Sequence, residues 1–484
     1  MRLQRSALLL TAAVAIAAMA ASSAFAQKAS SRGSSTTSTG HAMSTSNGGY
    51  SGGRIGITNG GLLDGPGISV GPGPQFIDNK PSGNTKSRDA RRRTTTPRNN
   101  NGGGTILPPS VPGEVLMETA NAVTPDQIRV WQQRYRLTLV EQQTLQLTGA
   151  TLMRWRIADR RSVPTLVNAF RRDGFTSQPN HLFALQESAT TQSFGSVNQY
   201  ELGKLHLPQA HELAKGSDVR VAVIDSGIDA SSPELADSIA ESFDTLSGPM
   251  KPHKHGTAIA GLIAAHGSLR GAAPDARLLA VRAFNPEGEA ARGTTFNILK
   301  GVDWAASHGA RVINMSFAGP NDPALHRSLE AAHKKGIVLV AAVGNAGPDS
   351  PPLYPGADPN VIGVTATDAD DKLFPLSNRG DQVAIAAPGA RILVVIPDGS
   401  YEVSSGTSYS AATVSGIVAL MLQREPTLTP DNAREILMAT AKDLGPKGRD
   451  PMFGAGLADA FAALMAEHSP MASTASAPSS PPAK

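Results

Sequence analysis

Three short segments in the second half of this 484-residue chain each hold a residue type that acyl transfer by serine requires. Asp225 stands in VAVIDSG, His255 in HKHGTAIAG and Ser408 in SGTSYS. A serine hydroxyl is a poor nucleophile at neutral pH, so an imidazole such as His255 is needed to take its proton. A carboxylate such as Asp225 would hold the tautomer of that imidazole. The side-chain amide of Asn345, in AAVGNAG, and the backbone N–H of Ser408 would donate to the oxyanion.

Each segment alone has a simpler interpretation. An Asp after a strand is often a turn or cap residue, and an Asn-Ala-Gly segment is often a turn. A Ser before an apolar helix is usually an N-cap, and Ser408 precedes such a run. The hypothesis of catalysis therefore depends on finding all four residue types in one chain.

The elements expected to position these residues alternate along the chain from Val219 onward. Strands are predicted at 219–224, 278–284, 312–317, 337–343, 361–365 and 383–387, and helices at 256–265, 296–307, 325–335, 408–422 and 431–441. Continuous apolar strands alternating with helices predict an α/β fold, with a parallel sheet covered on both faces. Sites in such sheets lie at the carboxyl ends of the strands, where Asp225 and Asn345 are expected.

A different pattern occupies residues 113–188. Strands are predicted at 114–119, 139–147, 152–157 and 181–186, with one helix opening at Thr124-Pro125-Asp126 and another at 163–170. The order strand-helix-strand-strand-helix-strand predicts a small α+β, ferredoxin-like domain. This architecture alone does not indicate a function.

The two ends of the chain are expected to lie outside the globular part. Residues 1–26 carry Arg2 and Arg5, an apolar run over 7–21 and the small-residue site Ala24-Phe25-Ala26, as in a cleaved signal peptide. An uncleaved anchor is the alternative, but the run is short for a membrane span. Residues 27–112, rich in Ser, Gly, Asn and Arg, and the tail 466–484 are predicted to be disordered. No later stretch is long and apolar enough to predict a membrane span.

Composition excludes some chemistry and reveals a charge asymmetry. The chain has no cysteine, which excludes disulfides and thiolate catalysis. Residues 27–199 hold 19 Lys and Arg against 10 Asp and Glu, whereas residues 200–465 hold 22 against 29. The resulting net charges of +9 and −7 would favour docking of the two parts. The basic run 86–93 lacks aromatic residues, so a solvated linker is favoured over a nucleic-acid site.

Together these motifs resemble the subtilase family of serine proteases. The family order Asp, His, Ser is matched by Asp225, His255 and Ser408 in VAVIDSGID, HGTAIAG and SGTSYSAATVSG. Asn345 in AAVGNAGP matches the family's oxyanion asparagine. VINMSFAG resembles the strand whose backbone pairs with an extended peptide, which implies substrate binding by Ser316, Phe317, Ala318 and Gly319. The segment GAGLADAFAAL over 454–464 resembles the end of the catalytic domain.

The resemblance implies a domain order and a fold. It implies a catalytic domain over 200–465 with a subtilisin-like, doubly wound, mostly parallel sheet and helices on both faces. It also implies that the α+β domain, over 113–190, is a pro-domain that assists folding and lays its last strand in the active cleft. Self-cleavage is then expected near residues 188–205. A permanently attached module is the alternative.

The chain also departs from the family pattern. Ala258 follows HGT in place of the usual His, Ala412 replaces a proline, and Phe317 and Ala318 replace a more usual Leu-Gly, which leaves substrate preference open. The short segment 265–271 lacks the ligands of a calcium loop that many subtilases carry there. A structural calcium therefore has no predicted location, and no cofactor is required for the chemistry.

Two other groups of residues have side chains that can bind metal ions, but neither has the spacing or the ligand number of a metal site. A surface turn is favoured over a cation site for Asp368, Asp370 and Asp371, because their spacing does not fit a calcium loop. The His253–His255 pair lacks a nearby third ligand, which disfavours zinc.

The sequence therefore predicts an exported serine endopeptidase, made as a pro-enzyme and secreted or periplasmic. Its expected partners are polypeptide substrates and its own pro-domain, and no nucleic acid is expected. The alternative is a non-catalytic export protein that keeps the fold as a binding or scaffold module. Sedolisins, which share the fold class, use a carboxylate as the base, so His255 argues against that variant.

Overall fold

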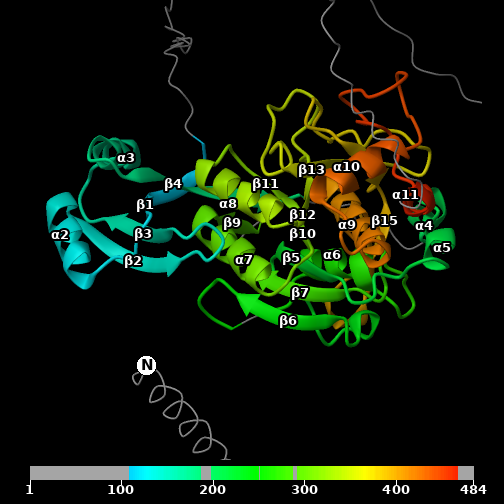
Figure 1. Cartoon of the computed structure of the whole chain (residues 1–484), viewed down its shortest axis with the longest axis horizontal. Coiled ribbons are helices and arrows are strands. Elements are labelled where there is room, and N and C mark those ends of the chain that lie inside the picture. The colour runs from blue at the N-terminus through cyan, green and yellow to red at the C-terminus, as the bar shows by residue number, and fades with distance from the viewer. Residues whose placement is uncertain (1–107, 187–197, 250, 287–290, 467–484) are drawn as a thin grey trace, which may run out of the picture. The chain divides into compact units, whose positions relative to one another are not determined.

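The computed structural model describes residues 108–186, 198–249, 251–286 and 291–466, all within one compact unit that spans Asn100–Lys484 (Figure 1). The predicted signal peptide and tail, and most of the predicted disordered arm, lie outside the described residues. Within the described part, no helix combines the length and apolar character needed to cross a bilayer.

The N-terminal part has the predicted strand and helix order. Its elements are β1 (Ser110–Thr119), α2 (Pro125–Tyr135), β2 (Leu137–Thr144), β3 (Thr151–Ile157), α3 (Val163–Arg172) and β4 (Thr176–Leu185). The strands pair antiparallel in the order β2-β3-β1-β4. Thr124 and Gln127 form a capping box at the start of α2. Both helices pack on one face of this sheet, around the buried rings of Trp155 and Phe170.

The two largest boundary differences in this part lie at the starts of β1 and β4. Strand β1 begins at Ser110, inside the segment predicted to be disordered, because Ser110 pairs with His181 and Pro109 O accepts from Leu182 N–H at 2.9 Å. Strand β4 begins at Thr176 rather than at residue 181. The segment Thr176-Ser-Gln-Pro-Asn180 has the composition of a turn, but antiparallel pairing with β1 keeps it extended.

The C-terminal part contains a sheet in which every described strand pair is parallel. Its order is β14-β13-β12-β10-β5-β7-β6. The strands are β5 (Arg220–Asp225), β6 (Ile239–Asp244), β7 (Arg277–Arg282), β10 (Val312–Met315), β12 (Val338–Ala342), β13 (Val361–Thr367) and β14 (Ile385–Pro388). Strand β6 was not predicted. Its sequence IAESFD carries polar residues because the strand lies at the edge of the sheet and is only half-buried.

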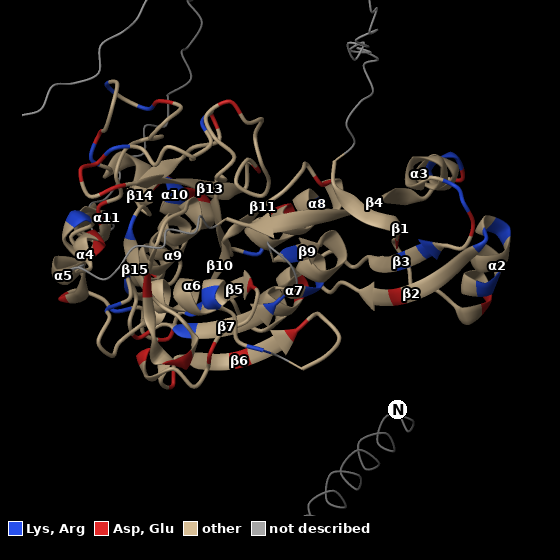
Figure 2. Ribbon diagram, turned by 180° about the vertical axis from the view of Figure 1, so that it is seen from behind, with Lys and Arg blue, Asp and Glu red and all other residues tan. Residues whose placement is uncertain are grey.

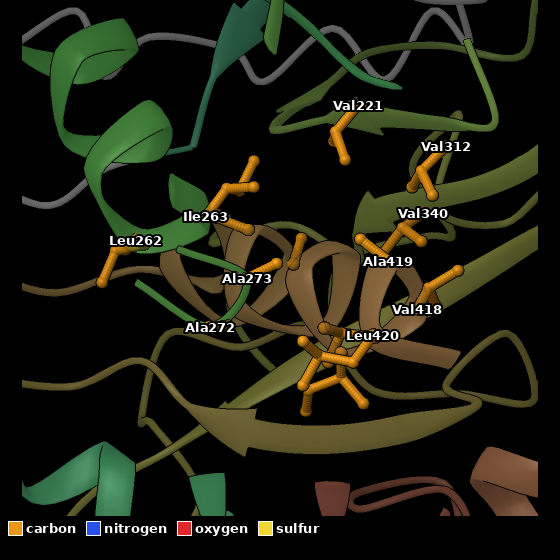
Figure 3. Packing of buried hydrophobic residues seen from close by; sticks show 14 of the residues in the cluster. Val221, Leu262, Ile263, Ala272, Ala273, Val312, Val340, Val418, Ala419 and Leu420 are labelled. Carbon is orange, nitrogen blue, oxygen red and sulfur yellow. The ribbon is translucent and has the colours of Figure 1, made fainter. Parts of the chain in front are cut away.

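Helices cover both faces of this sheet, as the alternating pattern predicts. The helices are α4 (Tyr200–Lys204), α5 (Leu207–His211), α6 (Lys254–Ala264), α7 (Thr295–Ser307), α8 (Pro323–Lys334), α9 (Thr407–Arg424), α10 (Pro430–Ala439) and α11 (Ala460–Ala466). Alternate residues of β5 enter different cores: Val221 and Val223 pack with α6 and α9, whereas Ala222 and Ile224 pack with α7 and α8. Figure 3 shows the first of these cores, where Val221, Val312 and Val340 of the sheet face Ile263 and Ala419 of the helices.

Short strands join the two parts into a second sheet. These are β8 (Phe284–Asn285), β9 (Arg292–Thr294) and β11 (Phe317–Ala318), while β15 (Ile392–Val395) and β16 (Tyr401–Ser404) form a separate hairpin. Strand β4 pairs with β1 of its own domain and also, along its C-terminal half, with β9 and β11 (Figure 1). The last strand of the α+β domain therefore also pairs with strands of the C-terminal part.

Two of the ion pairs across this boundary have the opposite sense to the predicted charge asymmetry. Figure 2 shows both signs of charge on α2, whereas the only charged residues of α3 are basic and lie in its last turn. At the boundary, Glu118 binds Arg327 at 2.7 Å and Glu141 binds Lys300 at 2.5 Å, so the α+β domain supplies the carboxylates. Ten of the 19 Lys and Arg residues counted over 27–199 lie before residue 108, outside the described residues.

Candidate active site

The predicted acid and base lie together at the carboxyl end of the parallel sheet. Asp225 is the last residue of β5, and His255 lies in the first turn of α6. His255 Nδ1 is 2.9 Å from Asp225 Oδ1 and 3.0 Å from Oδ2, and both side chains are buried. Because an ionised carboxylate can only accept, Nδ1 carries the hydrogen and the lone pair lies on Nε2, as a general base requires.

Neighbouring residues hold this pair in place. The N–H and the hydroxyl of Ser226 both donate to Asp225 Oδ1, at 2.7 and 2.9 Å. His253 is the N-cap of α6, and its Nδ1 accepts from the N–H of His255 at 3.4 Å. The carboxylate and the start of α6 are therefore fixed independently of His255's own ring.

Ser408 lies in the first turn of α9, and its hydroxyl is not used to cap the helix. The N-cap is Gly406, and the cap position has no side-chain hydrogen bond. Ser408 Oγ instead donates to the main-chain carbonyl of Gln186 and lies 3.2 Å from Ser316 O. The next residue, Tyr409, has its ring centroid 6.1 Å from that of His255, so the start of α9 lies beside the base.

Asn345 follows β12 and is oriented by the residue before the serine. Its Oδ1 accepts from the N–H of Thr407 at 3.1 Å and from the Thr407 hydroxyl at 2.8 Å. These two donors identify the oxygen of the amide, which places Nδ2 on the opposite side. Nδ2 is buried and makes no hydrogen bond within the described residues. An amide is therefore held against Thr407, the residue before Ser408, with a buried donor that has no acceptor among the described residues.

The end of β4 lies against the strand expected to bind substrate. Phe317 pairs with Leu185 and Ala318 with Ala184, and Ser316 O accepts from the N–H of Gln186 at 3.3 Å. On the other side, Ala184 pairs with Arg292 of β9. The stretch Leu182–Gln186 is thus an antiparallel strand between two catalytic-domain strands, and its last carbonyl meets Ser408.

Comparison with known proteins identifies this arrangement. The sequence profile of the subtilase family matches residues 216–456, and thermitase from Thermoactinomyces vulgaris is 34% identical over 261 residues, which are 52% of this chain and 91% of thermitase. The chain belongs to the subtilase family. Subtilisin E from Bacillus subtilis is 35% identical over 273 residues, 54% of this chain and 70% of that protein.

Two longer relatives are matched over a smaller share of their length. The minor extracellular protease Epr of Bacillus subtilis is 33% identical over 302 residues, 61% of this chain and 46% of Epr. The solved structure of fervidolysin from Fervidobacterium pennivorans, a keratinolytic enzyme related to subtilisin, superposes with a TM-score of 0.64 at 23% identity. That match covers 74% of this chain and 61% of fervidolysin, and it supports the fold alone.

Membership of the family confirms the predicted fold class and places the chain among the subtilisin-like serine endopeptidases. The structure adds residues that the motifs did not reveal. Thr407, Ser226 and Gln186 contact the candidate catalytic groups, and β9 borders the cleft. Of these residues, only Thr407 could have been suspected from the sequence, because it directly precedes Ser408. Strand β9 is only three residues long, too short for a hydrophobic period.

The structure shows where the residues that depart from the family pattern lie, and what the acidic residues at 368–371 contact. Ala258 and Ala412 are both buried in the core around α6 and α9. Asp368 caps a turn by accepting from the N–H groups of Asp370 and Lys372, and Asp371 binds Lys204 and Lys442. Among the residues that the structure describes, no group of three or more His, Asp and Glu is placed to hold a metal ion.

Proposed function

We propose that this subtilase is an exported serine endopeptidase, made as an inactive precursor, in which Asp225, His255 and Ser408 form the catalytic triad. The observation that carries the proposal is the contact between the Ser408 hydroxyl and the carbonyl of Gln186, which is held in an extended strand as a substrate would be. This hydrogen bond brings the Gln186 carbonyl within reach of the Ser408 hydroxyl, and holding the reacting groups together is a large part of catalysis.

The reaction would proceed in two steps. Ser408 Oγ attacks the carbonyl carbon while His255 Nε2 takes its proton, and Asp225 stabilises the imidazolium. The oxyanion accepts from Asn345 Nδ2 and from the N–H of Ser408. Collapse of this intermediate breaks the C–N bond, and the amine leaves with the proton from His255. Water then attacks the acyl-enzyme by the same route, which restores Ser408 and releases the acid. None of these steps requires a metal or cofactor.

The α+β domain, assigned to residues 113–190, would act as the pro-domain. Its last strand occupies the cleft, and its contacts with the catalytic domain extend beyond the strand. Gln178 Nε2 and His181 Nδ1 bind the buried Asp322 at 2.7 and 2.9 Å, and Asn180 Oδ1 accepts from the N–H of Phe296. The position of Gln186 supports a first self-cleavage at the Gln186–Glu187 bond, just before the segment 188–205 expected from the sequence.

Export is proposed from the N-terminal sequence and from the relatives. The segment 1–26 has the layout of a cleavable signal peptide. One relative, Epr, is described as an extracellular protease. Polypeptides are the substrates that the family implies.

The test is Ser408→Ala in the full chain. The variant should keep the Gln186–Glu187 bond and hydrolyse no peptide, while the unchanged chain should yield a new N-terminus at Glu187 and react with a fluorophosphonate probe. N-terminal sequencing and intact mass measure processing and signal removal together. Peptide hydrolysis by the Ser408→Ala variant would refute Ser408 as the nucleophile. An unchanged chain that takes no probe after processing would favour the scaffold alternative.

A further inference from the structure

Gln186 is held in the cleft by its side chain as well as by its backbone. Its backbone N–H donates to Ser316 O, and its carbonyl accepts from Ser408 Oγ. These contacts define Gln186 as the acyl residue, meaning the residue whose carbonyl Ser408 would attack. The side chain of Gln186 therefore occupies the place that any substrate would fill with its own acyl residue.

The side-chain amide of Gln186 uses its acceptor and its donor at the same time. Oε1 accepts from the backbone N–H of Asn345 at 2.8 Å. Nε2 donates to Ala184 O at 3.0 Å and lies 3.3 Å from Leu185 O. The acceptor contact ties the amide to the residue that carries the proposed oxyanion donor. The donor contacts use carbonyls of the bound strand itself.

We infer that the active site selects glutamine as the acyl residue of its substrates, an inference that rests on the proposed function. Of the 20 side chains, only glutamine offers an acceptor and two N–H donors at this distance from the backbone. Glutamate would reach the N–H of Asn345, but its second oxygen would face two carbonyl oxygens without a hydrogen to share. Asparagine is one methylene shorter, and methionine has the length without the polar groups.

These differences predict an order of substrates. These hydrogen bonds are only partly buried, and an acceptor placed against acceptors both loses a hydrogen bond and adds repulsion, so it costs more than the loss of one hydrogen bond alone. The expected kcat/KM for glutamine is about five times that for methionine and at least about tenfold that for glutamate or asparagine. The comparison is made at pH 7.5, where a glutamate side chain is ionised.

The experiment uses the full chain after self-processing and four fluorogenic peptides, acyl-Phe-Ala-Leu-X-aminocoumarin, with X as Gln, Met, Glu or Asn. Active enzyme is counted by fluorophosphonate labelling. Selectivity in the expected order supports the inference. Equal kcat/KM for Gln and Met, or a Glu peptide within twofold of Gln, overturns it while the proposed function stands. Hydrolysis of none of the four, by enzyme that takes no label, overturns the proposed function instead.

A matched pair of variants tests the same contacts within the chain. The side chains introduced by Gln186→Met and Gln186→Glu have nearly equal length, so the two variants should fold alike. A difference between them then reports on the polar contacts of residue 186. Intact mass over time measures cleavage at residue 186. Slower self-cleavage for Gln186→Glu than for Gln186→Met is expected. The reverse order would contradict the inference, because it would mean that a carboxylate is accepted there.

Discussion

Glu201 provides a test of the structure that does not involve the active site. It lies in α4, downstream of the proposed cleavage bond, and only 2% of its surface is exposed. Burial raises the pKa of its carboxyl from 4.5 to about 7, and a hydrogen bond from Gln199 Nε2 at 3.3 Å offsets only part of this effect. The charged form is therefore disfavoured in the folded state.

The sign and size of the effect on stability follow from this pKa. A carboxyl that binds its proton more tightly when folded contributes stability fully below pH 4.5, and that contribution is lost as the pH rises through about 7. A shift of this size corresponds to about 3 kcal/mol. Glu201→Gln keeps the shape of the neutral acid, so it should raise the free energy of unfolding by up to about 3 kcal/mol at pH 8 and change it little at pH 4.

The assay is urea unfolding at several pH values in a Ser408→Ala background, which prevents self-digestion. Glu212→Gln, at an exposed position just after α5, is the matched control and should leave the pH dependence unchanged. If Glu201→Gln changes the free energy of unfolding equally at pH 4 and pH 8, or not at all, the raised pKa of Glu201 in the folded protein is refuted.

Two further predictions concern the candidate site and its inhibitor. Asn345→Ala should lower kcat by a factor on the order of 10²–10³ and change KM little. This factor is the one known for loss of the oxyanion-hole asparagine in subtilisin, a member of this family. An equal loss through KM would contradict an oxyanion role. His181→Ala should remove one bond to buried Asp322 and shorten the delay between self-cleavage and full activity by about tenfold. Arg134→Ala, which alters a half-exposed pair within the α+β domain, should leave that delay unchanged.

The sequence predicted those parts of the fold and site that have local signals. Buried strands such as β12 are continuous apolar runs, and Asp225, His255, Asn345 and Ser408 stand at strand ends or helix starts in recognisable segments. Their chemical roles remain predictions, but their convergence at one edge of the sheet follows from the parallel topology.

What the sequence could not reveal depends on contacts between distant residues. Strand β6 was missed because an edge strand needs few apolar residues, and the start of β4 was missed because its pairing with β1 outweighs a turn-like composition. Gln178 and Asp322 are 144 residues apart, and no local pattern links them. The docking expected from net charge stays a prediction, because ten of the basic residues counted for it lie outside the described residues.

The sheet that β4 shares with β9 and β11 has a consequence for what can be digested. A polypeptide reaches Ser408 in this geometry only by offering unpaired main-chain groups along several consecutive residues, and natively folded proteins have few such stretches. On the proposed function, compact proteins would therefore be protected, whereas frayed ends and unfolded chains would be cut. Under the same proposal, cutting the chain after Gln186 would not free the active site, because β4 would stay paired with β9 and β11 until the α+β domain unfolds.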